Sequence, residues 1–169
     1  MKIELKNVKI NKSFSQETTC FMASVYINGN RAAYAQNDGR GGNTYYRAYD
    51  RFAGLVEDAE KYCLTLPDEH VDLGNGSKFV LSQSLETVID NLLIEKELEK
   101  EKKEIDKLCL SNIVWGKPNG GTYKYMGFKG KPTIEHVKNV SNGQQSLDRL
   151  INRVKSQLVE GEVIFNKNI

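Results

Sequence analysis

The clearest hydrophobic alternation in the chain runs from residue 19 to residue 27. Every second position in this stretch is apolar, namely Phe21, Ala23, Val25 and Ile27. A period of two is typical of a strand with one buried face. Asn28-Gly29 follows directly, and both residues tolerate the positive φ angles of a type I′ turn. We therefore predict a β-hairpin whose second strand covers residues 31–36.

The segments on either side of this hairpin predict an edge strand and a helix. In residues 2–10, Ile3 and Leu5 share one parity, whereas Val8 and Ile10 share the other, which indicates a bulge or twist near residues 6–7. Between residues 52 and 63 the apolar residues recur at helical spacing, with Asp50 as the expected cap and Pro67 as the boundary. The front of the chain is therefore predicted to be a β-β-β-α unit.

A long charged helix is predicted to begin at Ser84. Its first turns carry the apolar stripe Leu85, Val88, Ile89 and Leu92. Nine of the ten residues in 95–104 are charged, and opposite charges four residues apart support an exposed helix. The whole element is expected to cover about 25 residues, or about 38 Å. A turn at residues 73–77 and a short strand at residues 78–81 are expected before it.

The rear of the chain predicts strand, hairpin, loop, helix and strand. Residues 113–115 precede a Pro-Asn-Gly-Gly turn, and residues 122–128 form the return strand. Residues 147–158 carry a helical stripe that Gly161 ends, and residues 163–165 read as a last strand. The predicted fold class is α+β, with small antiparallel sheets, packed helices and one long charged helix. We expect three parts, namely an N-terminal lobe (1–66), an acidic segment with the connecting helix (67–110) and a basic C-terminal lobe (111–169).

The charge of the chain is small in total but unevenly distributed. The 169 residues carry a formal charge of +2, which argues against a protein that coats nucleic acid indiscriminately. Residues 1–66 hold nine basic and seven acidic residues (+2), residues 67–110 hold six and eleven (−5), and residues 111–169 hold nine and four (+5). A local basic contact surface is therefore compatible with the near-neutral total.

Several function classes lose support from composition. No apolar run reaches membrane-spanning length and residues 1–5 do not resemble a signal peptide, so we expect a cytoplasmic protein without membrane contact. The three cysteines lie more than 40 residues apart without a C-x-x-C pair, and we expect them to be reduced. Two histidines exclude a multi-histidine metal site. We assign no catalytic residue, metal or cofactor, which favours binding over catalysis.

A glycine-rich loop at residues 37–43 is the first candidate binding surface. Three glycines in four positions allow positive φ angles and can direct consecutive N–H groups at an anion. Nearby guanidinium groups suit phosphate, and tyrosine rings suit a base or a peptide side chain. The loop lacks the lysine of a P-loop and the spacing of a dinucleotide fingerprint, so a plain connector is the competing interpretation. The candidate contacts are Gly39, Arg40, Gly41, Gly42, Arg47 and Arg51, with Tyr45 and Tyr46 as aromatic partners.

The second candidate surface lies in the rear hairpin, where aromatic residues and lysines interleave. Alternation places Tyr123 and Tyr125 on one face of the strand and Lys124 on the other. Aromatic stacking with backbone neutralisation is what a single-stranded nucleic acid needs. A half-buried hairpin, with aromatics inward and lysines outward, has the same pattern, so both interpretations remain open. The candidates are Lys124, Lys129, Lys131, Trp115 and Tyr125.

Four segments of the chain carry a resemblance to known proteins. Residues 15–23, residues 25–29, residues 37–42 and residues 160–168 resemble small uncharacterised proteins of bacteriophages and mobile elements. The resemblance supplies no catalytic residues. It implies a class that includes anti-CRISPR-type inhibitors, which bind effector nucleases, guide RNA or signalling nucleotides.

The function expected from these observations is non-enzymatic binding. We predict a protein that recognises a host nucleoprotein complex, RNA or DNA in a bacterial host cell. The resemblance adds the expectation that it inhibits a defence effector such as a CRISPR nuclease. The alternative is a protein that sequesters or hydrolyses a phosphorylated small molecule or signalling nucleotide through the glycine-rich loop.

Overall fold

The computed structural model describes residues 1–72 and 78–169 and divides into two compact units, residues 1–95 and residues 96–169. Each unit combines antiparallel strands with helices, which confirms the predicted α+β class. The helix α2 (Leu85–Cys109) contributes residues to both units.

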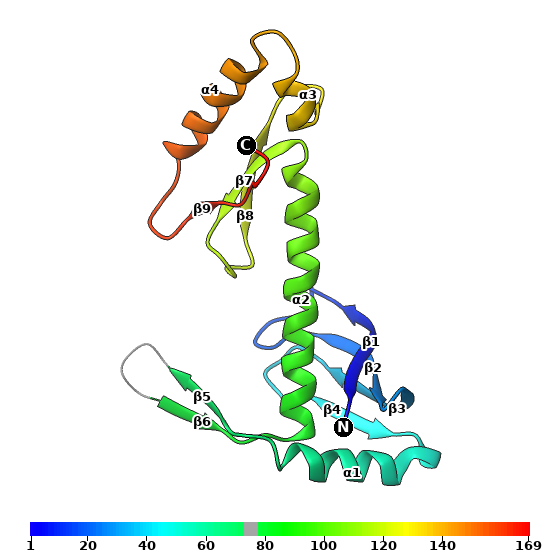
Figure 1. The fold of residues 1–169 in the computed structure, drawn as a ribbon. Coiled ribbons are helices and arrows are strands. Elements are labelled where there is room, and N and C mark those ends of the chain that lie inside the picture. The colour runs from blue at the N-terminus through cyan, green and yellow to red at the C-terminus, as the bar shows by residue number, and fades with distance from the viewer. Residues whose placement is uncertain (73–77) are drawn as a thin grey trace. The chain divides into compact units, whose positions relative to one another are not determined.

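The first unit is built on a four-stranded antiparallel sheet in which strands follow chain order (Figure 1). Its strands are β1 (Ile3–Ile10), β2 (Phe21–Ile27), β3 (Asn30–Asn37) and β4 (Tyr45–Ala48). Between β2 and β3, Asn28 has φ 49° and Gly29 has φ 84°, which confirms the predicted turn with two positive φ angles. The strand β4 extends the predicted three-stranded arrangement by one strand.

The predicted irregularity of the first strand is confirmed. The pairing register of β1 with β2 shifts between Lys6 and Lys9, and Asn7 has φ 53°. An extra residue in one strand reverses which parity faces the core. Leu5 before the shift and Ile10 after it therefore both face the core side.

One face of this sheet is buried against two helices, α1 (Ala53–Cys63) and the first turns of α2. The strands bring mainly small and β-branched side chains to this core, and the helices bring apolar side chains one turn apart. The fully buried members include Val25, Ile27, Ala33 and Ala35 from the sheet and Ala59, Cys63, Leu85 and Ile89 from the helices. Small alanines in β3 let the helices approach the sheet closely, as the density of protein interiors requires.

The start of α1 differs from the prediction. A 3₁₀ turn, η1 (Asp50–Phe52), precedes the helix, and Phe52 occupies the N-cap position. The prediction that Asp50 caps α1 is therefore wrong, because the 3₁₀ turn displaces the helix start to Ala53. The apolar spacing located the body of the helix correctly, since Val56, Ala59 and Cys63 are buried.

Between α1 and α2 the chain forms a two-stranded antiparallel sheet of β5 (Glu69–Asp72) and β6 (Lys78–Leu81). The strand β6 confirms the strand predicted at residues 78–81, whereas β5 was not predicted. The turn predicted at residues 73–77 lies outside the described residues.

The predicted long charged helix is confirmed as α2. The Ser84 hydroxyl oxygen accepts the Thr87 N–H at 3.1 Å, which caps the first turn of the helix. Leu85, Ile89 and Leu93 are buried at helical spacing. Of the helices in residues 1–72 and 78–169, none combines the length and apolar character that crossing a membrane requires.

The second unit packs two helices on a three-stranded sheet of order β8-β7-β9. Its elements are β7 (Asn112–Gly116), β8 (Tyr123–Gly127), α3 (Ile134–Lys138), α4 (Gly143–Lys155) and β9 (Val163–Ile164). The core contains Ile113, Trp115, Ile134, Val137, Leu147 and Val154. The helix α3 was not predicted, and α4 begins one turn earlier than the apolar stripe indicated.

The Asn166 side chain ties the end of the chain to β7. Its amide oxygen accepts the Val114 N–H at 2.7 Å, and its amide nitrogen donates to the Asn112 carbonyl at 2.8 Å. The same nitrogen lies 3.2 Å from the Cys109 carbonyl oxygen at the end of α2. One side chain thus satisfies backbone groups of two elements of the second unit.

The packing of α3 against α4 predicts a strong effect of Gly143→Ala. A Cβ atom at Gly143 would overlap the Val137 carbonyl oxygen, so we expect a loss of about 1–3 kcal/mol in unfolding free energy. Urea unfolding followed by the fluorescence of Trp115, the single tryptophan and a core residue of this unit, measures the loss.

The matched control is Gly54→Ala in the first turn of α1. A Cβ atom at Gly54 meets nothing within 4 Å, and alanine is the better helix former by about 1 kcal/mol. Far-UV circular dichroism should therefore show this variant to be at least as stable as the native chain. Equal stability of the two variants would contradict the proposed packing.

Candidate nucleic-acid interface

The register of the four-stranded sheet determines which side chains point away from α1 and α2. Directly opposed residues of antiparallel strands project from the same face. Lys9 pairs with Met22, Met22 with Gln36, and Gln36 with Tyr45, which gives a row across all four strands. None of these four residues belongs to the described core, and Met22 is 59% exposed. This row therefore lies on the face opposite the helices.

Two further rows complete this face. Lys6, Ser24, Tyr34 and Arg47 are opposed in register across the four strands. In the third row, Tyr26 is paired with Glu4 on β1 and with Arg31 on β3. We call the outward set the open sheet face, and its members that can bind an anion or a ring are Lys6, Lys9, Met22, Tyr26, Arg31, Tyr34, Tyr45 and Arg47.

The open sheet face is basic although its unit is acidic. Residues 1–95 hold ten basic and thirteen acidic residues, a net charge of −3. The face carries four cations and one carboxylate, that of Glu4, which pairs with Lys2 at 3.1 Å. Six of the other twelve acidic residues lie on the helices that cover the opposite face, namely Glu57, Asp58 and Glu60 on α1 and Glu86, Asp90 and Glu95 on α2. The sheet therefore separates a basic face from an acidic helical side.

Tyrosine rings form a continuous row along β3 and β4. The ring centroid of Tyr34 lies 6.1 Å from that of Tyr45 and 6.4 Å from that of Tyr49, with interplanar angles of 55° and 48°. At the end of the row, the Arg31 guanidinium carbon lies 5.5 Å from the Tyr49 centroid. Tilted ring pairs and cation–π contacts are attractive geometries. The row therefore holds its own rings in position, and Tyr45 at its other end is 51% exposed.

The glycine-rich loop is held by the Asn37 side chain. Its amide oxygen accepts the Gly39 N–H and the Thr18 hydroxyl, both at 2.8 Å. Its amide nitrogen donates to the Gly42 carbonyl at 2.8 Å. Asn37 is buried, so these contacts form a shielded network beneath the loop.

Three amides of this loop already donate hydrogen bonds within the protein. Besides the Gly39 N–H, the Arg40 N–H donates to the Asp38 carboxylate and the Gly41 N–H donates to the Thr18 hydroxyl, each at 3.2 Å. Gly39 and Gly41 have φ 85° and 89°, and a Cβ at Gly39 would overlap the Phe14 carbonyl oxygen. Gly39 therefore allows the loop backbone to lie close to the Phe14 carbonyl. Three of the N–H groups that were expected to bind an anion already donate to acceptors within the protein.

Two of the predicted contact residues lie on the helical side. Tyr46 alternates with the outward residues of β4, and its hydroxyl donates to the Glu60 carboxylate at 2.8 Å. Burial, and then the hydrogen bond to Glu60, raises the pKa of Tyr46 well above its usual range. The Arg51 guanidinium carbon lies 4.6 Å from the Phe52 ring centroid, next to the start of α1. Of the candidates near the loop, Arg47 and Tyr45 lie on the open sheet face, and Arg40 is exposed in the loop itself.

The start of β4 is anchored to α2 by Thr44. Its N–H donates to the Glu86 carboxylate at 2.8 Å, and its hydroxyl donates to the Asp90 carboxylate at 2.6 Å. Burial raises the pKa of Asp90, the Thr44 hydrogen bond opposes this effect, and the neighbouring Glu86 adds to it. This anchor fixes the strand that carries Tyr45 and Arg47.

The candidates of the second unit are divided between its core and its surface. Trp115 is 2% exposed, and within the described chain its indole Nε1 has no hydrogen-bond partner. Its ring therefore fills the core and is not accessible to a ligand. Tyr125 projects from the opposite face of the hairpin and is 58% exposed, while Lys129 and Lys131 are exposed in the turn after β8.

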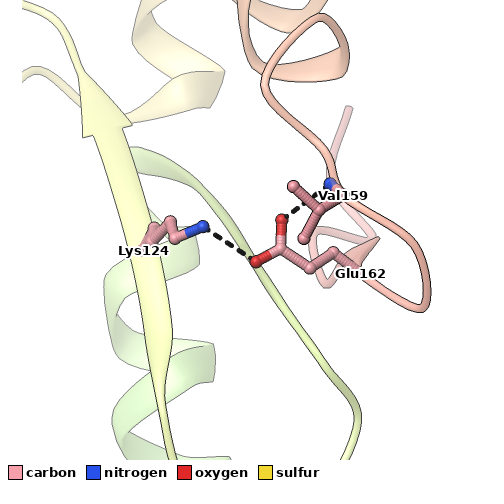
Figure 2. A network of polar contacts seen from close by, with 3 residues as sticks. All are labelled: Lys124, Val159 and Glu162. Carbon is pink, nitrogen blue, oxygen red and sulfur yellow. Dashed lines mark hydrogen bonds and ion pairs between the residues drawn. The ribbon is translucent and has the colours of Figure 1, made fainter.

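Lys124 is held in an ion pair, as Figure 2 shows. Its Nζ lies 2.9 Å from Glu162 Oε1, and the other oxygen of Glu162 accepts the Val159 N–H at 3.1 Å. The hydrogen bond from Lys124, and then that from Val159, lowers the pKa of Glu162. Lys124 therefore links β8 to the segment before β9. This ion pair competes with any contact between Lys124 and a phosphate.

No metal centre is evident in the described part of the chain, because no three His, Cys, Asp or Glu side chains there are arranged to hold an ion. Cys63 and Cys109 are buried, and burial raises the pKa of both thiols. Thiols in this condition are poor nucleophiles.

Seven residues of the open sheet face and its tyrosine row were missed in the sequence. They are Lys6, Lys9, Met22, Tyr26, Arg31, Tyr34 and Tyr49. The signal in the sequence is the second parity of the same strands, which carries polar and aromatic side chains between the apolar, buried positions. The bulge in β1 then had to be placed correctly before Lys6 and Lys9 could be assigned to one face.

Comparisons of the chain with protein-family models, with curated proteins and with solved structures found no match. The function is therefore inferred from the geometry of the two units.

The hydrogen bonds of Asn37 to the glycine-rich loop predict that Asn37→Ala destabilises the first unit. Removing this buried side chain takes away the hydrogen-bond partner of the Gly39 N–H and of the Gly42 carbonyl. We expect this loss to lower the free energy of unfolding by about 1–3 kcal/mol. Urea unfolding by far-UV circular dichroism measures the loss, and amide exchange at Gly39 should accelerate. Gln36→Ala, at an exposed neighbouring position, is the control. Unchanged exchange at Gly39 would show that Asn37 does not hold the loop.

The ion pair of the second unit predicts a pH-dependent contribution to stability. Because the folded-state pKa of Glu162 is lowered, its contribution is present above the ordinary carboxyl pKa and is lost as pH falls through the lowered value. Glu162→Gln should therefore be less stable than the native chain at about pH 7, and this difference should shrink towards about pH 3.

Urea midpoints of Trp115 fluorescence at both pH values provide the measurement. Glu160→Gln, which removes a carboxylate two residues away, controls for net charge. A difference between native chain and Glu162→Gln that stays constant with pH would exclude this role for the carboxylate.

Proposed function

We propose that the protein binds nucleic acid, free or within a nucleoprotein complex, through the open sheet face and without catalysing a reaction. The observation that supports this function is the separation of charge in the first unit. Four cations, one carboxylate and a tyrosine row share one face of the sheet, while the helices on the other side carry six carboxylates. A long polyanion with flat bases is the ligand whose chemistry matches this face.

The placement of the cations fits an extended ligand better than a compact one. Lys6 and Lys9 lie on the edge strand β1, and Arg47 lies on the edge strand β4. The two edge strands are three strand spacings apart, a distance of about 14 Å. Phosphates of one backbone can therefore meet cations at both edges while rings occupy the space between them.

The alternative ligand, a phosphorylated small molecule in the glycine-rich loop, has less support. Such a cradle depends on free N–H groups, and the amides of Gly39, Arg40 and Gly41 donate within the protein. Inhibition of a bacterial defence effector, which the resemblance to phage proteins implies, stays a prediction. Binding of a guide RNA or of an effector complex through the open sheet face would be one route to it.

The proposal predicts that Arg31→Ala with Arg47→Ala weakens nucleic-acid binding by at least about tenfold at low salt. Each phosphate contact that is lost should also reduce the slope of log K against log salt by about 0.7 for a single strand. Fluorescence anisotropy with a labelled oligonucleotide at several salt concentrations measures both quantities.

The matched control is Arg40→Ala with Arg51→Ala. Both double variants remove two positive charges, and each removes one arginine that lies over an aromatic ring, Arg31 over Tyr49 or Arg51 over Phe52. Only the first pair lies on the open sheet face, so the control should keep its affinity and its salt slope. Equal losses in the two variants would indicate a general effect of net charge and would contradict the proposed face.

A further inference from the structure

The open sheet face also indicates which form of nucleic acid it accepts, and this inference rests on the proposed function. We infer that the ligand is a single strand, with two or three unpaired bases stacked on the side chains around Tyr34 and Tyr45. Single-stranded RNA and single-stranded DNA share the chemistry that this face would recognise, an unpaired base on a flexible phosphate backbone.

Exposed side chains on this face, one of them aromatic, are the first reason. Tyr45 is 51% exposed and Met22, in the same cross-strand row, is 59% exposed. A base stacked on them would remove their apolar surface from water, which is favourable. In a duplex the base faces are already paired and stacked, and the outer surface offers phosphates and groove edges. Of these two forms of nucleic acid, only an unpaired strand therefore offers base faces that can stack on the aromatic part of the open sheet face.

The arrangement of the rings is the second reason. Tyr34 is tilted by 55° against Tyr45 and by 48° against Tyr49, so these rings do not cover one another face to face. Their mutual contacts and Arg31 fix their positions before a ligand arrives. Preorganised rings lose little conformational entropy on binding, which favours stacking.

The size of the face is the third reason. The sheet is about 14 Å wide from β1 to β4. Four-stranded sheets that bind RNA stack two or three bases on their aromatic residues. Lys6, Lys9 and Arg47 lie at the edges of the sheet, where the backbone of so short a segment would enter and leave.

The test uses the full-length protein and labelled oligonucleotides of about 12 nucleotides, within the range of known single-strand site sizes. Four ligands are compared by fluorescence anisotropy: oligo-dT, oligo-U, a DNA duplex of the same length, and a strand of the same length with abasic sites. The abasic strand keeps the phosphates but has no bases to stack. The two pyrimidine strands separate DNA from RNA as the preferred source of the same chemistry.

We expect the better of the two single strands to bind at least about tenfold more tightly than the duplex and the abasic strand. Tyr45→Leu should weaken single-strand binding by about tenfold and leave the weak binding of the abasic strand unchanged. Tyr45→Phe keeps the ring and should bind as the native chain does. Far-UV circular dichroism of both variants shows whether the sheet is intact, and the comparison of ligands with the native protein does not depend on either variant.

Two results overturn the inference in distinguishable ways. Equal affinity for single strand, duplex and abasic strand, with a loss of binding in the Arg31→Ala, Arg47→Ala variant, would leave the proposed function standing and exclude base stacking. Unchanged binding in that double variant would remove the proposed function, and the inference about the single strand would fail with it.

Discussion

The burial of one face of the four-stranded sheet is the constraint on which the first unit depends. Strand side chains alternate with a period of two, so a shift of one residue would exchange the buried and exposed sets. Val25 and Ile27 on β2 and the alanines of β3 must face α1 and α2, because the core is built from them. That requirement fixes the register, and the register then fixes every outward residue. The open sheet face is therefore a consequence of the same packing that makes the unit stable.

Local features near the face keep this register in place. The bulge between Lys6 and Lys9 returns Ile10 to the core side. The Asn37 network shapes the turn into β4, and Thr44 ties the start of that strand to α2. In this account the glycine-rich loop acts as a structural element, and the binding chemistry lies on the strands that it joins.

Much of the fold, but only part of the candidate site, could be predicted from the sequence. The hairpin at Asn28-Gly29 and the long helix α2 were found because each has a strong local signal. The strand β4 was missed because Tyr45–Ala48 is short and follows a glycine-rich loop, and its partner strand supplies the pairing. The burial of Trp115 could not be decided because a core hairpin and a stacking platform have the same alternation, and only packing against α3 and α4 distinguishes them. The pairing of β4 and the burial of Trp115 therefore depend on tertiary contacts, which local sequence patterns do not reveal.

The central claim is that ligand binding occurs on the open sheet face. A titration of the isotope-labelled full-length protein with a short single-stranded oligonucleotide, followed by amide chemical shifts, tests it most directly. We expect shifts at Met22, Arg31, Tyr34, Tyr45 and Arg47, with little change in the second unit. Shifts confined to residues 38–43 or to the turn with Lys129 and Lys131, or the absence of any shift, would contradict it.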